Sequence, residues 1–137
     1  TFMLVGYVIG ILTIPKIISQ EKALIISAIA GLVLTILLLV TRNTVPVIAL
    51  ASLGLANALM WPAIWPLAID GLGKHIKLGS AFLIMAIAGG AVIPFIYGKL
   101  FDFESIGAQK AYFIMIPCYL FILYYAMAGH KVGREKV

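Results

Sequence analysis

Apolar residues form five uncharged runs along the chain, which short polar clusters separate. The runs cover about residues 1–15, 23–40, 44–69, 80–98 and 111–129. A helix needs roughly 17–25 apolar residues to cross the hydrocarbon core of a bilayer, and the last four runs meet that requirement. The first run is shorter, so we expect it to be the end of a span whose beginning lies outside the sequence. The pattern predicts an all-α membrane protein with one truncated and four complete transmembrane helices.

The run 44–69 carries polar and aromatic side chains near its middle. Asn57, Trp61 and Trp65 follow one another at four-residue spacing, which places them on one face of a helix. An unpaired amide in apolar surroundings costs ~1–3 kcal/mol, so Asn57 needs a partner. Either this face lines the path of a solute that these side chains bind, or the amide and both indoles pack against neighbouring helices.

Two prolines lie beside that face. Pro62 and Pro66 lack a backbone N–H, so the carbonyl groups of Ala58 and Pro62 lose their helical hydrogen bonds. Such a break at membrane depth is tolerated where other protein groups or a water-filled cavity satisfy the freed carbonyl groups. We therefore expect a kinked helix, with both prolines as structural residues of the candidate site.

Small residues mark two other predicted helices. Gly6 and Gly10 lie about one turn apart and allow another helix to approach closely, whereas Tyr7 between them can either pack or bind a solute. In the run 80–98, small residues and a proline recur at four-residue spacing, with one additional glycine: Ala86, Gly89, Gly90, Pro94 and Gly98. This face predicts very close packing against another helix, with a bend at Pro94.

Composition supports the membrane assignment, and charge suggests an orientation. Charged residues make up 11% of the chain, against roughly 25% in soluble domains. The net charge of +5 comes from residues at the ends of the runs, which is typical of membrane topology rather than of nucleic-acid binding. With alternating spans, one side receives Lys16, Lys22, Lys74, Lys77, Lys131, Arg134 and Lys136, and the other receives Arg42, Lys99 and Lys110. The first side, which includes the C-terminus, is therefore predicted to be cytoplasmic.

The runs contain no ionisable side chain near their middle, and this restricts the function. Proton-coupled carriers need a titratable group inside the membrane, so that group would have to lie outside this sequence. His75 stands without a second metal ligand nearby, and the glycines of the loop 70–80 lack a phosphate-binding spacing. We expect no enzyme, no metal and no cofactor. One amide, two indoles and nearby tyrosines instead suit an uncharged polar solute such as a sugar.

Three stretches carry a resemblance to a known family. They are NALMWPAIWPLAIDGLGK at 57–74, KLGS at 77–80 and MAIAGGAVIP at 85–94. In this combination, and over nearly the whole chain from Gly6, the sequence resembles the fucose–proton symporter family of the major facilitator superfamily, which includes bacterial glucose/galactose porters. The resemblance implies the C-terminal part of a twelve-helix carrier in the bacterial inner membrane, in which the run 44–69 is helix ten and lines the central cavity.

The resemblance also implies partners and site residues. Trp61 takes the position of a sugar-binding aromatic residue, and Asn57 the matching polar position. The implied partners are a hexose or deoxyhexose, a coupling proton, the lipid bilayer and the missing N-terminal half, which holds the coupling acids. Tyr7, Trp61 and Asp70 depart from the fucose branch, so a glucose/galactose-type or other hexose porter fits better. The alternative hypothesis is a non-transporting membrane subunit that binds a partner through its glycine-rich helix.

Overall fold

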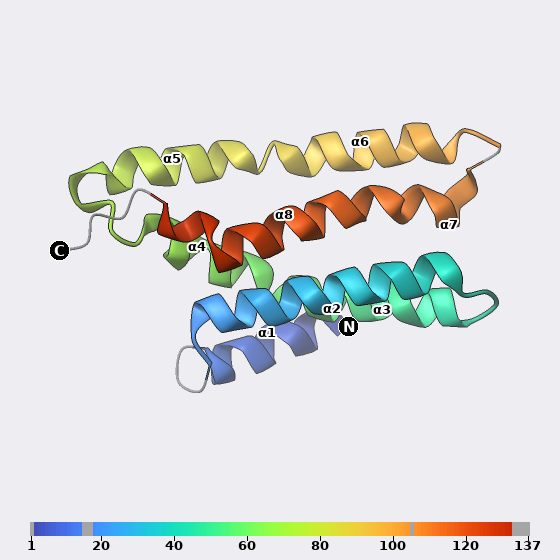
Figure 1. The fold of residues 1–137 in the computed structure, drawn as a ribbon, viewed down its shortest axis with the longest axis horizontal. Coiled ribbons are helices and arrows are strands. Elements are labelled where there is room, and N and C mark those ends of the chain that lie inside the picture. The colour runs from blue at the N-terminus through green and yellow to red at the C-terminus, as the bar shows by residue number, and fades with distance from the viewer. Residues whose placement is uncertain (1, 15–17, 105, 133–137) are drawn as a thin grey trace.

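The computed structural model describes residues 2–14, 18–104 and 106–132, and within these ranges it contains helices and no strand (Figure 1). This confirms the predicted all-α fold. The α-helices are α1 (Phe2–Thr13), α2 (Gln20–Val40), α3 (Val45–Ala58), α4 (Met60–Ile69), α5 (Ile76–Ala86), α6 (Gly89–Phe101), α7 (Gly107–Ala111) and α8 (Met115–Met127). Short 3₁₀ turns are η1 (Gly73–His75), η2 (Tyr112–Ile114) and η3 (Gly129–Lys131).

Several of these elements join end to end into longer helices. The described residues contain four helices that are long and apolar enough to cross a membrane: Gln20–Val40, Val45–Ile69, Gly73–Phe101 and Gly107–Met127. In Figure 1 they lie side by side along the long axis of the molecule and alternate in direction. The ends of α4 and α8 and the beginnings of α2 and α5 therefore lie at the same end of the molecule.

Helix α2 is the centre of the packed part of the chain. It packs against α3, α4 and α8, and α1 covers the other side of α3. The buried residues include Leu24 and Leu38 of α2, Leu53 of α3 and Tyr119 of α8. Because lipid is as apolar as these side chains, close van der Waals packing rather than hydrophobic burial stabilises such contacts. Gly6 illustrates this, since a Cβ there would lie 2.7 Å from Cβ of Ala58.

The outer surface of α5 and α6 has no partner among the described residues. Neither helix contains a buried residue. A Cβ built at Gly89, Gly90 or Gly98 would meet no atom within 4 Å of the described structure. The predicted close contact of this small-residue face is therefore not made within the described ranges, and the surface is available to another protein segment or to lipid.

A side-chain amide joins α7 to the end of α2. The Nε2 group of Gln109 donates hydrogen bonds to the carbonyl oxygens of Leu38 and Thr41, both at 2.7 Å. The last four carbonyl groups of a helix have no partner within the helix, so Gln109 satisfies acceptors that would otherwise depend on water. It thereby ties together two segments that lie about 70 positions apart in the sequence.

We expect Gln109→Ala to lower the stability of the folded protein by roughly 1–3 kcal/mol, since each net hydrogen bond contributes about 0.5–1.5 kcal/mol. Thermal unfolding of the detergent-purified protein measures the effect as a lower Tm. Lys110→Ala is the matched control, because Lys110 is the exposed neighbour and forms no hydrogen bond or ion pair with the described residues. Equal Tm values for the two variants would contradict a stabilising role for the amide.

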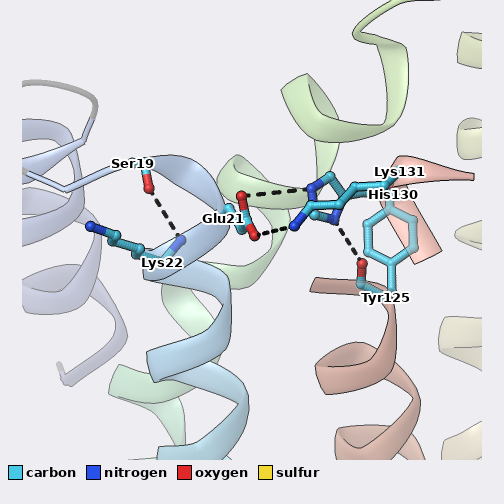
Figure 2. A network of polar contacts seen from close by, with 6 residues as sticks. All are labelled: Ser19, Glu21, Lys22, Tyr125, His130 and Lys131. Atoms are coloured by element: carbon cyan, nitrogen blue, oxygen red, sulfur yellow. Dashed lines mark hydrogen bonds and ion pairs between the residues drawn. The ribbon is translucent and has the colours of Figure 1, made fainter. Parts of the chain in front are cut away.

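At the opposite end of the molecule, charged residues join the beginning of α2 to the segment after α8 (Figure 2). Nζ of Lys131 lies 2.9 Å from a carboxylate oxygen of Glu21, and Nε2 of the buried His130 lies 3.8 Å from the other. Nδ1 of His130 lies 3.0 Å from the carbonyl oxygen of Tyr125. A carbonyl oxygen only accepts, so this nitrogen carries the hydrogen. The contacts hold α2 and α8 together where the spans end.

Candidate functional site

The helix that contains the predicted site is interrupted at Leu59, between α3 and α4. The backbone hydrogen-bond pattern resumes with the amide of Ala63, which donates to the carbonyl oxygen of Leu59 at 3.2 Å. Pro62 has no N–H with which to reach Ala58, so the interruption lies within one turn of this proline. Pro66 lies inside α4, and the helix continues past it to Ile69. The irregular backbone thus lies between Asn57 and Trp61, the first two residues of the predicted face.

The two tryptophans lie outside the buried side of α4, with Trp61 exposed and Trp65 half-buried among the described residues. Met60, Ala63 and Leu67 form the buried side of this helix, whereas 41% of the surface of Trp61 is exposed. The ring centroids of Trp61 and Trp65 are 5.8 Å apart, with an angle of 59° between the planes. The two rings therefore form one aromatic surface, although no ring of another helix is described in contact with it.

Asn57 is oriented differently from the tryptophans, towards α8. The hydroxyl group of Tyr119 donates a hydrogen bond of 2.9 Å to Oδ1 of Asn57. The side chain of Asn57 is half-buried, and that of Tyr119 is 2% exposed. The carbonyl half of the amide therefore has an interhelical partner, which was one of the two possibilities left open by the sequence. The amino half has no hydrogen-bond partner among the residues that the structure describes.

Tyr119 is the residue that sequence reasoning gave no role. Its position in the middle of the run 111–129, away from both membrane interfaces, was an available signal. The ring lies directly on Gly31 of α2, where an added Cβ would come within 2.7 Å of Cζ and 2.8 Å of Cδ1. Because Gly31 has no side chain, α2 leaves space for the ring of Tyr119, and its hydroxyl group can reach Asn57.

Tyr7 is placed apart from this group. It is half-buried on α1, which packs against α3. Within the described ranges, no hydrogen bond or ring contact joins Tyr7 to Asn57 or to either tryptophan. The structure thus brings Trp61 and Trp65 together and gives Asn57 a separate partner, while Tyr7 stays on a neighbouring helix.

The surroundings of the aromatic pair are neutral. In the described spans, Asp, Glu, His, Lys and Arg side chains lie only near the ends, as in Lys22 of α2 and Lys99 of α6. The described residues contain no group of three His, Cys, Asp or Glu side chains that could hold a metal ion. A cleft of about 510 Å³ lies beside the end of α4, but its walls include Asp70 and His130 rather than mid-span residues. The chemistry available at mid-span is therefore hydrogen bonding and aromatic contact without charge.

Comparison with known proteins identifies relatives that are bacterial membrane transporters. A glucose/galactose transporter of Brucella abortus is 36% identical over 116 residues, which are 85% of this chain and 28% of the relative. The L-fucose-proton symporter of Escherichia coli is 30% identical over 105 residues, 74% of this chain and 24% of the relative. That of Haemophilus influenzae is 32% identical over 78 residues, 54% of this chain and 18% of the relative.

These matches cover most of this chain but less than one third of each relative. Their names describe transporters, which supports the expectation that the chain is not an enzyme. No protein-family model matches the chain, and no solved structure matches it significantly. The relatives therefore indicate the family and a role in transport, whereas the roles of the individual site residues are argued from the geometry alone.

Proposed function

The chain is homologous over most of its length to the bacterial glucose/galactose transporters and L-fucose–proton symporters of the fucose permease family, as its motifs predicted, and we propose that it forms part of a sugar carrier. The observation that carries the proposal furthest is the Trp61–Trp65 pair, with Trp61 exposed and Trp65 half-buried, beside a break in an otherwise uncharged membrane helix. Homology supports a sugar as the solute, and the aromatic pair is the surface on which we propose that it binds.

The proposed substrate is a neutral hexose or deoxyhexose. One face of a sugar ring carries C–H groups that pack on an aromatic surface, and its edge carries hydroxyl groups that pair with amide and indole N–H groups. Trp61, Trp65 and Asn57 offer both kinds of contact within about two helical turns. Tyr7 would contribute from α1 if the sugar extends to that helix. Pro62 and Pro66 would have a structural role beside the site, as the positions of a helix kink or of close packing against another helix.

Proton coupling is the second part of the proposal. Two of the relatives are named as proton symporters. Coupling to protons needs a titratable group at membrane depth, and the described spans carry no Asp, Glu, His, Lys or Arg near their middle. We place that group in a part of the carrier other than these helices. The Trp61–Trp65 pair then binds the sugar without titrating.

The remainder of the carrier is the proposed partner of α5 and α6. The relatives are more than three times as long as the stretch they share with this chain, and the small-residue face of these helices is uncovered. In such carriers two halves rock around a site at the middle of the membrane. Gly89, Gly90 and Pro94 would then lie where the halves meet. We also propose that the protein lies in the bacterial inner membrane with its C-terminus in the cytoplasm, which the excess of basic residues on that side supports.

We expect Gly90→Leu to reduce sugar uptake at least fivefold while leaving the stability of these helices unchanged. The position is open within the described structure, so the larger side chain meets no atom of this chain but would separate the proposed halves. Initial uptake rates and membrane abundance, measured together, give the result. Val92→Leu is the control, because Val92 is also exposed on α6 but is already large. Unchanged uptake by Gly90→Leu would argue against an interface at this face.

A second candidate is a membrane subunit that transports nothing and uses the same uncovered face to bind another protein. The open surface of α5 and α6 favours it as much as it favours the carrier. Reconstitution of the native protein into liposomes separates the two. The carrier gives saturable uptake of labelled glucose, galactose or fucose that a proton gradient increases. Absence of uptake and of binding for all three sugars, by protein shown to be inserted, would favour the subunit.

A further inference from the structure

The amide of Asn57 is held in one orientation by a residue of another helix. The Tyr119 hydroxyl donates to Oδ1 of Asn57 at 2.9 Å. The carbonyl oxygen and the amino group lie on opposite branches of the same planar amide. Fixing the oxygen against Tyr119 therefore also fixes the direction of the two N–H donors.

Those two donors lack an acceptor within the described chain. Leaving amide donors unpaired in apolar surroundings is unfavourable. The side chain of Asn57 is half-buried rather than enclosed, so an acceptor from outside can reach it. The adjacent turn carries Trp61, whose ring is the most exposed part of the aromatic surface described above.

Tyr119 itself is held firmly. Its side chain is 2% exposed, and its ring fills the space over Gly31. The hydroxyl group of the buried Thr35 donates to the carbonyl oxygen of Gly31 at 2.7 Å, within the same turn of α2. The phenol is therefore fixed by α2 and aimed at α3, and it cannot turn away without disturbing the packing of both helices.

From this geometry we infer that Tyr119 is a positioning residue, which orients Asn57 so that its N–H donors meet one hydroxyl group of the sugar lying on Trp61. The inference rests on the proposed function and adds a role for α8. Tyr119 contacts no sugar itself. It determines which hydroxyl pattern the site prefers, because a fixed pair of donors discriminates against a sugar that lacks the matching hydroxyl.

The test uses the native protein in liposomes, with galactose and its four monodeoxy analogues at positions 2, 3, 4 and 6 as probes. In the unchanged protein, one analogue should have a KM about tenfold higher than galactose. Asn57→Ala should remove that difference by weakening galactose binding about tenfold, and Tyr119→Phe should reduce it by weakening galactose binding about three- to tenfold. The maximal rate should change less than twofold. The double variant should resemble Asn57→Ala, since Tyr119 acts through that amide.

Tyr124→Phe is the matched control, because it removes the hydroxyl of an exposed tyrosine on the same helix. It should leave every KM unchanged. Tyr119→Phe overturns the inference if it keeps the preference among the analogues, if it lowers the rate for all sugars equally, or if it fails to reach the membrane. In that last case the bond would serve folding rather than orientation. If the unchanged protein binds no sugar, the proposed function fails together with the inference.

Discussion

Replacing Trp61 by alanine is expected to abolish sugar uptake by the native protein while leaving its insertion into the membrane intact. The indole is 41% exposed and lies outside the buried side of α4, so its removal leaves the helix packing in place. It does remove half of the Trp61–Trp65 surface. Uptake of labelled galactose should fall at least a hundredfold, and the amount of protein in the membrane fraction should stay within twofold of the unchanged protein.

Two further variants make this result specific. Phe121→Ala truncates an aromatic side chain on α8 that is 69% exposed, so it controls for the loss of a large apolar surface and should transport normally. Trp61→Phe keeps an aromatic face and should retain a part of the activity. Normal uptake by Trp61→Ala would remove Trp61 from the site, whatever the substrate.

A single methyl group added at Gly31 is expected to destabilise the protein and to weaken sugar binding together. The new Cβ would lie 2.7 Å from Cζ and 2.8 Å from Cδ1 of Tyr119, closer than van der Waals contact allows. Overpacking of this kind costs about 1–3 kcal/mol. Relief requires the ring to move, which lengthens its hydrogen bond to Asn57. We expect a lower Tm and a KM for galactose raised at least as much as in Tyr119→Phe.

Gly54→Ala is the matched control for this prediction. It adds the same methyl group to a membrane helix, α3, but the nearest atom of the described structure lies 3.8 Å from the new carbon, an ordinary van der Waals contact. Alanine in a helix is otherwise more favourable than glycine by about 0.5–1 kcal/mol, so Tm should be unchanged or slightly higher. If Gly31→Ala and Gly54→Ala have the same Tm, the ring of Tyr119 is not seated as described.

The helices could be predicted from the sequence because each is encoded locally. Uncharged runs of sufficient length specify membrane helices whatever their neighbours are, and charged residues mark their ends. The aromatic pair was predictable for the same reason, since Trp61 and Trp65 are joined by helical spacing alone. The described ends of the helices nonetheless extend beyond the runs, as in Gly73–Phe101, because polar residues continue the helix into the interface.

The contacts between helices could not be predicted from the sequence. The prolines indicated a kink but not that the interruption falls at Leu59, which depends on how α3 and α4 pack against α2. Tyr119 and Gln109 pair with groups 62 or more positions away in the sequence, and the local pattern of a single sequence carries no signal for such pairs. The amide of Asn57 was correctly expected to need a partner, but its identity required the fold.

We propose that a neutral sugar binds at the Trp61 surface. A measurement of equilibrium binding tests this directly, because it involves no transport step. Calorimetric titration of galactose and glucose into the detergent-purified native protein is the measurement, repeated with Trp61→Ala and Phe121→Ala. We expect saturable binding by the unchanged protein and by Phe121→Ala, and at least a thirtyfold weaker Kd for Trp61→Ala. Equal affinity in all three proteins would contradict it.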